Sequence, residues 1–476
     1  MKNAEAESIE GIINNAVEAV RRERLEEAEK FFLQALDEDG LLFWRVLAPE
    51  SFFSLVHIPD NSIREWGISF TKKLIEKSKE KGFWLKALKL QSQLTPSHFK
   101  SRFEYFKEIA LSYFYCGLTE EGYAYLERAL ECELDPEVVR WYSTMAYRSG
   151  RNRSKAIDLV NKLVRQENVS PETLLLKADL LWEEGERDTA IYFYREGERL
   201  SKGYKNQWFC IFTRDELRQE WEKYRRLYGV PLHSPFDNSV STIFLHLYRT
   251  GGRSVFSMLC PNYLPWEVRI TMGEKLVSFN NELKDKRDWC NMIPFIHIHT
   301  PFGWKVPFKR ERWRMFTVCR DPVKRAVSWY NNRLARRTAN KGSYWLPPCI
   351  KEGKPFHTFI RWLVNTRHHN SFARSLCEIR YGEEQTNDLS SDTIKAVSYE
   401  MLNELWEVFI FEHFAPSMLA SAALLGLNRL CYPRRTTDLD GAKGIISIND
   451  LSKEDKDLTA RTYDIDMELY EVLLKR

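Results

Sequence analysis

Three glycines recur at spacings of 33 and 35 residues in the first half of this 476-residue chain. Gly117, Gly150 and Gly185 each lie between two segments with the apolar spacing of an amphipathic helix. A small residue follows five or six positions later, where the two helices of a pair would cross closely. The spacing predicts stacked helix pairs of about 34 residues, each of which buries its apolar face against its neighbours.

These small residues are Gly122, Ala156 and Ala190, and the pattern resembles the tetratricopeptide repeat. Ala28 and Ala35 suggest a first repeat near residues 8–40, whereas residues 41–100 match poorly. We therefore expect an all-α, tetratricopeptide-like solenoid over residues 1–229. The pattern leaves open whether the solenoid binds a protein partner, mediates self-association or is a structural spacer.

The Pro-containing stretch 230–239 reads as a linker, and the pattern changes after it. Apolar strands then alternate with helices, which is typical of an α/β domain with a largely parallel sheet. We expect this second domain to cover residues 240–476. The segments that carry the alternation are "TIFLHL", "SVFSMLC", "MIPFIHIHT", "RWRMFTVCR" and "VKRAVSWYNNRLARR".

Charge is distributed unevenly between the two halves. Residues 1–240 hold 36 Lys and Arg against 40 Asp and Glu, whereas residues 241–476 hold 35 against 27. The basic half is therefore expected to bind an anion. The nine cysteines form no C-x-x-C pair, and the first 30 residues hold no apolar core of signal-peptide length. We expect reduced thiols, a cytoplasmic location, no membrane insertion and no nucleic-acid partner.

The stretch "IFLHLYRTGGRSV" (243–255) predicts a buried strand that runs into a glycine turn and then a helix. Loops of this shape bind phosphate-like anions, because backbone N–H groups and a helix N-terminus point at the ligand. The loop lacks the G-x-x-x-x-G-K-[ST] pattern of an ordinary nucleotide-binding loop, which argues against a kinase.

A second strand-to-helix stretch is "MFTVCRDPVKRAVSWYNNRL" (315–334). Arg320 at the strand end and Ser328 on the helix could converge on one anion, since an arginine fork and a hydroxyl donor are a usual pair for phosphate. Pro322 suits the first turn of the helix. Residues 301–340 hold 11 Lys and Arg but only two acids, Glu311 and Asp321.

Together these stretches resemble the sulfotransferases that use 3′-phosphoadenosine 5′-phosphosulfate (PAPS). "FLHLYRTGGRS" is similar to their phosphosulfate loop and "RDPVKRAVSWY" to their 3′-phosphate stretch. The C-terminal "LSKEDKDLTARTYDIDMELYEVL" (451–473) is similar to the terminal helix of the carbohydrate enzymes. The nearest branch is that of the heparan sulfate 2-O- and 6-O-sulfotransferases. The resemblance covers residues 240–476 and implies a P-loop-like α/β fold.

The resemblance implies that PAPS is the donor and that its product is the 3′,5′-bisphosphate (PAP), with no metal required. Arg320 and Ser328 would hold the 3′-phosphate. The family usually has Lys where this chain has Arg249, and an arginine effectively never gives up its proton. The residues expected around the phosphosulfate are Arg249, Thr250, Gly251, Gly252, Arg253 and Ser254.

A general base is expected in "FIHIHTPFGW" (295–304), because histidine titrates near neutral pH. Strand alternation places His297 and His299 on one face. The family's base lies in a similar stretch, so His299 is the first candidate and His297 the second, with Arg249 as the catalytic cation. A metal-binding pair, or two packed core histidines, are the alternatives.

Other residues carry weaker expectations. His246 is expected to be structural, and His368 and His369 to be surface residues near the substrate cleft. The basic stretch 432–444 resembles a loop that folds over the family's donor, and three aromatic residues could line an acceptor groove or belong to the core. The residues concerned are Arg434, Arg435, Lys443, Trp304, Trp329 and Tyr330.

The sequence thus predicts a PAPS-dependent O-sulfotransferase acting on an acceptor hydroxyl, with a glycan as the favoured acceptor. A protein-tyrosine sulfotransferase, or a non-catalytic PAPS- or PAP-binding scaffold, stays open as an alternative.

Overall fold

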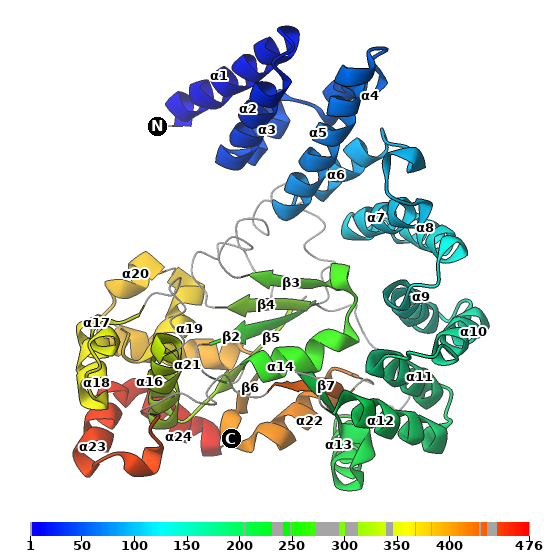
Figure 1. Ribbon diagram of the computed structural model, residues 1–476. Helices are drawn as coiled ribbons and strands as arrows, with labels where there is room; N and C mark the ends of the chain where they lie inside the picture. The colour runs from blue at the N-terminus through cyan, green and yellow to red at the C-terminus, as the bar shows by residue number, and fades with distance from the viewer. Residues whose placement is uncertain are drawn as a thin grey trace. The chain divides into compact units, whose positions relative to one another are not determined.

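The computed structural model divides into two compact units: unit 1 comprises residues 1–163 and 271–293, and unit 2 comprises residues 164–270 and 294–476 (Figure 1). The residues it describes are 2–202, 206–230, 241–247, 250, 252–271, 295–299, 313–338, 346–366, 368–381, 383–427, 430–435 and 445–475.

Unit 1 consists of helix pairs joined by short turns. At the predicted turn positions, Gly117 and Gly150 adopt positive φ angles of 72° and 71°, and in unit 2 Gly185 does the same with 87°. A Cβ atom on Gly122 would lie 2.6 Å from the ring of Phe114, so the close helix crossing expected there requires glycine. The helices of unit 1 are α1 (Lys2–Arg21), α2 (Leu25–Glu38), α3 (Gly40–Val46), α4 (Phe53–His57), α5 (Asn61–Glu80), α6 (Trp84–Gln91), α7 (Arg102–Tyr115), α8 (Thr119–Cys132), α9 (Pro136–Ser149) and α10 (Arg153–Val164).

Unit 2 is built around a five-stranded sheet in the order β3-β4-β2-β5-β6 (Figure 1). The pairs β2–β4, β2–β5 and β5–β6 are parallel. Every residue of β2 is buried, as expected for a central strand covered on both faces. The strands are β2 (Ser241–His246), β3 (Val268–Thr271), β4 (Phe295–His299), β5 (Trp313–Cys319) and β6 (Glu407–Ile410).

A separate antiparallel pair joins β1 (Asn206–Cys210) to β7 (Cys431–Arg435). Cys210 and Cys431 are partners in this register, are fully buried and form a disulfide. The expectation of reduced thiols is therefore wrong for this pair. The two cysteines are 221 residues apart in the sequence, and no short cysteine motif predicts that they pair.

The remaining helices of unit 2 cover the sheets or pack beside them. They are α11 (Pro171–Glu183), α12 (Arg187–Ser201), α13 (Asp215–Leu227), α14 (Gly252–Leu259), α16 (Pro322–Thr338), α17 (Pro348–Lys351), α18 (Phe356–Asn365), α19 (Ser371–Tyr381), α20 (Glu383–Asn387), α21 (Ser391–Glu404), α22 (Phe414–Leu424), α23 (Lys453–Thr462) and α24 (Asp464–Lys475). The strand–helix order β2, α14, β4, β5, α16 confirms the predicted α/β region with a parallel sheet.

The compact units divide at residues 163 and 164, not near the predicted linker. Helices α11–α13 belong to unit 2 because their apolar side chains share one core with the sheet. Trp182, Tyr194 and Trp221 lie in the same buried cluster as Phe244 of β2 and Phe316 of β5. Residues 231–240, and with them almost all of the predicted linker, lie outside the described residues.

Candidate functional site

The two predicted anion-binding loops leave neighbouring strands of the sheet at the same edge. The last registered pair of β2 and β5 is Leu245 with Thr317. The hydroxyl of Thr317 donates to the carbonyl of Leu245 at 2.8 Å and holds the strands together there. Both loops therefore start side by side at the carboxyl end of a parallel pair.

This edge is also where the connections of the sheet diverge. From β2 the chain passes through α14 to β3, which lies on the β4 side of β2. From β5 it passes through α16 and later helices to β6, on the opposite side. In open α/β sheets such a switch point, at the carboxyl ends of the strands, is where ligands bind.

In the β2–α14 loop, Thr250 is fully buried and its hydroxyl donates to the carbonyl of Leu247 at 2.9 Å. A hydroxyl has one proton, so the Thr250 side chain uses its donor to hold the loop. Gly252, Arg253 and Ser254 form the first turn of α14, which contains no acid. Arg249 and Gly251 lie outside the described residues.

In the β5–α16 junction, Asp321 caps the helix. Its carboxylate accepts from the Lys324 N–H at 2.8 Å, and Pro322 is the first helical residue, as predicted. Arg320 stacks on Phe411 with its guanidinium 4.5 Å from the ring centroid. Burial lowers the pKa of Arg320, and the negative charges of Glu412 and Asp321 oppose that shift. Arg320 thus stays a half-buried cation beside the switch point.

Ser328 is half-buried on α16, in the second turn after Asp321. Arg320 therefore lies just before α16, and Ser328 lies within this helix. Trp329 and Tyr330, by contrast, are buried in an apolar cluster with Phe359, which places them in the core.

His297 is buried beneath α14, at 6% exposure, among aromatic rings. Its ring stacks on Phe244 of β2 at 5.3 Å and on Phe256 of α14 at 4.8 Å. Its Nε2 atom lies 3.1 Å from Nδ1 of His246, which is also buried. One nitrogen of this pair donates and the other accepts, so the contact couples the tautomers of the two rings.

This environment corresponds to the packed-histidine alternative for His297. His299 ends β4, with its backbone in register with His246; its side chain lies outside the described residues. Within the described part of the chain, no group of three or more His, Cys, Asp or Glu side chains could hold a metal ion.

Two buried partners in this region were not predicted. Arg325, five residues after Arg320, forms an ion pair with Asp466 of α24, and both are at most 3% exposed. The same carboxylate accepts from the N–H groups of Phe372 and Ala373 at the start of α19, at 3.1 and 2.9 Å. A signal was present: the buried face of α24 is apolar except for Asp466.

The weaker candidates are spread over several elements. Arg434 and Arg435 belong to β7 and pair in register with β1. His368 lies beside Trp362 and Trp329, with ring centroids 5.4 and 5.8 Å away. Burial and the neighbouring Arg333 and Arg374 lower the pKa of His368. Trp304 and Lys443 lie outside the described residues.

No protein-family model matches this chain, and a search of curated proteins found no match either. None of the helices in the described part of the chain is long and apolar enough to cross a membrane.

Proposed function

We propose that the protein is a PAPS-dependent O-sulfotransferase whose active site lies at the switch point between β2 and β5. The observation that supports this most directly is the placement of the two motif-bearing loops. Both follow neighbouring parallel strands at one edge, where the strand connections diverge. A donor with two anionic ends needs two such anion sites side by side.

The residues present are chemically suited to that donor. The β2–α14 loop offers backbone N–H groups at the start of a helix without acids in its first turn, which suits the 5′-phosphosulfate. Arg320 offers a partly desolvated guanidinium and Ser328 a hydroxyl, which suit the 3′-phosphate. The excess of basic residues in the second half of the chain favours an anionic donor.

In the proposed reaction an acceptor hydroxyl oxygen attacks the sulfur atom of PAPS. The new bond joins that oxygen to sulfur, and the bond between sulfur and the bridging oxygen breaks. The electron pair leaves with the 5′-phosphate of PAP, and the acceptor proton passes to His299. Arg249 and the loop N–H groups stabilise the charge that develops on the departing and equatorial oxygens.

Histidine 297 has a positioning role in this proposal. Its ring is enclosed by Phe244, Phe256 and His246, so it holds the end of β4 against β2 and α14. That leaves His299, which lies two residues further along β4 at the end of the strand, as the base. Arg249 stays protonated throughout and therefore acts electrostatically and not as a proton donor.

The favoured acceptor is a glycan hydroxyl, and the helix pairs of the N-terminal half would recruit it or a protein partner. The tetratricopeptide-like character of these pairs is part of the proposal. A tyrosine acceptor and a scaffold without turnover are the competing outcomes of the test below.

The test is transfer of radiolabel from [³⁵S]PAPS to a panel of acidic glycans and tyrosine peptides. His299→Ala is expected to lower the rate by about 10²–10⁴-fold while PAP binding is kept, because a general base contributes on that scale. His357→Ala, which removes an exposed histidine on α18, is the matched control and is expected to leave the rate unchanged.

Three outcomes separate the alternatives. Labelled tyrosine peptide without labelled glycan would replace the acceptor. PAP binding without any labelled product, also in Arg249→Lys, would favour the scaffold. Absence of PAP binding would overturn the proposed site itself.

A further inference from the structure

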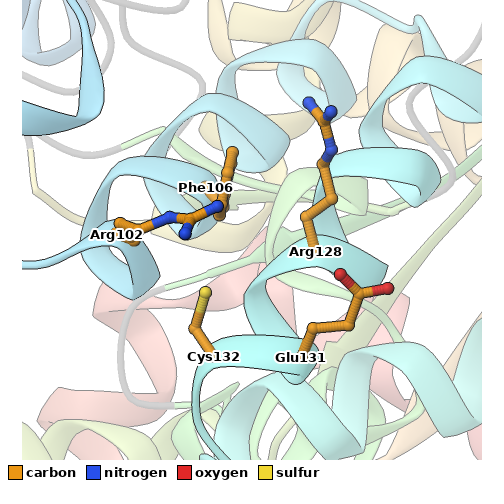
Figure 2. A pocket seen from close by; sticks show the side chains of 5 residues that line it. All are labelled: Arg102, Phe106, Arg128, Glu131 and Cys132. Carbon is orange, nitrogen blue, oxygen red and sulfur yellow. The ribbon is translucent and has the colours of Figure 1, made fainter.

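Unit 1 contains a pocket of about 370 Å³ between α7 and α8 (Figure 2). It is lined by Arg102 and Phe106 of α7 and by Arg128, Glu131 and Cys132 of α8. Phe106 is buried at 6% exposure, whereas the two arginines, Glu131 and Cys132 are exposed. The pocket therefore has an apolar floor and a charged rim.

The two arginines share the ring of Phe106. Their guanidinium carbons lie 5.9 Å (Arg102) and 5.4 Å (Arg128) from its centroid, and Arg128 also lies 5.6 Å from the ring of Tyr125. Figure 2 shows the side chain of Phe106 between the guanidinium groups of Arg102 and Arg128. Stacking on an aromatic face holds a guanidinium in place while leaving its N–H donors at the edge available.

Several lysines of unit 1 that stack on rings are also paired with a carboxylate. Three lysines show this, at N–O distances of 2.6 to 2.9 Å: Lys79 on Trp84 with Glu108, Lys107 on Trp141 with Glu137, and Lys155 on Tyr142 with Glu127. Among the described residues, no carboxylate oxygen lies within 4.0 Å of a guanidinium nitrogen of Arg102 or Arg128. Within the same residues, no cationic nitrogen lies within that distance of the Glu131 carboxylate. The pocket thus combines two uncompensated positive charges with one carboxylate that can accept hydrogen bonds.

We propose that this pocket binds a small hydroxylated oxyanion, of the class of sugar phosphate or sugar sulfate monoesters. The two arginine forks match the oxygens of a phosphate or sulfate group. Glu131 can accept a hydrogen bond only from a ligand that also carries donors, and a sugar ring supplies hydroxyls. The volume fits one small ligand and not an extended chain.

The experiment is isothermal titration of the full chain with glucose 6-phosphate and glucose 6-sulfate in separate arms. Saturable binding is expected with at least one ester. The ester that binds with the higher affinity shows whether the pocket prefers phosphate or sulfate. Arg102→Gln and Arg128→Gln are each expected to weaken binding by about tenfold, because each removes a charge-assisted contact. Arg153→Gln, which removes a guanidinium stacked on Tyr147 in another helix pair, is the matched control and should leave binding unchanged.

The proposal does not depend on sulfotransferase activity. Arg320→Gln distinguishes binding in this pocket from binding at the proposed donor site of unit 2. Binding that is lost in Arg320→Gln but kept in Arg102→Gln would place the ligand in unit 2 and overturn the proposal. Equal binding of inorganic sulfate or phosphate would mean an adventitious ion only. Equal binding of glucose, or of an acidic peptide in place of the esters, would also overturn it.

Discussion

The two strand-to-helix junctions at the edge of the sheet present an anion with different groups. At the β5–α16 junction the helix start is already occupied: Asp321 accepts from the Lys324 N–H, and Pro322 has no N–H. An anion there has fewer backbone N–H groups to use, and Arg320 offers a side-chain donor. At the β2–α14 junction no acid lies in the first turn, so in the proposed site the helix start itself receives the anion.

The junctions also differ in how they are held. A buried ion pair, Arg325 with Asp466, fixes the first turn of α16 to the C-terminal helix α24 and to the start of α19. In the described part of the β2–α14 loop, the contact seen is local: the Thr250 hydroxyl donates to the carbonyl of Leu247. The difference suggests that one junction is anchored by tertiary contacts and the other by the loop itself, and the predictions below test this.

The largest effect is expected from Asp466→Ala, which leaves Arg325 charged and buried. Removing one partner of such a pair costs about 3–5 kcal/mol of unfolding free energy. Urea denaturation followed by tryptophan fluorescence measures the loss. The control is Glu468→Ala, on the same helix as Asp466. It breaks the exposed ion pair of Glu468 with Lys395 of α21 and is expected to cost less than about 1 kcal/mol. Equal losses for the two variants would mean that the buried pair does not anchor α16.

A smaller effect is expected from Thr250→Val, which keeps the shape of the side chain and removes its hydroxyl. The buried carbonyl of Leu247 then loses its hydrogen bond, at a cost of about 1–2 kcal/mol. Thermal or urea unfolding measures this, and Thr250→Ser, which keeps the donor, should stay close to the wild type. If Thr250→Ser loses as much as Thr250→Val, the methyl group and not the hydroxyl holds the loop.

The elements around both junctions could be predicted from the sequence, because buried parallel strands are continuous apolar runs and the helices start at Gly252 and Pro322. The contacts that fix them could not. Asp466 lies 141 residues from Arg325, and Cys431 lies 221 residues from Cys210, so these pairs arise only when the chain is folded. Helices α11–α13 show the same limit: their pattern continues the helix pairs, but their apolar faces belong to the core of the sheet.

The candidate site shows the same contrast between local features, which the sequence predicts, and contacts between distant segments, which it does not. The sequence was sufficient to place Arg320 at a strand end and Thr250 in the loop after a strand, since strand-to-loop changes are local. The roles of His246 and His297 depend on which strands are neighbours: β2 and β4 are separated by 48 residues but lie in register. That register brings the two histidine rings into contact, and no spacing within one strand predicts it.

The smallest change in stability is expected from Ser254→Asp, and it separates the two junctions most sharply. A carboxylate in the first turn of α14 interacts favourably with the helix N-terminus and stabilises the free protein by about 0.5 kcal/mol. It also puts at this junction the kind of group that Asp321 provides at the other, so an anion is repelled from the helix start. PAP lacks the sulfuryl group but keeps the 5′-phosphate, so its affinity, measured by titration calorimetry, should fall by about tenfold or more. Ser254→Asn, which is close to aspartate in size but carries no charge, should change PAP affinity far less. If both variants leave the affinity unchanged, the start of α14 is not the anion site, and the contrast between the junctions has no bearing on binding.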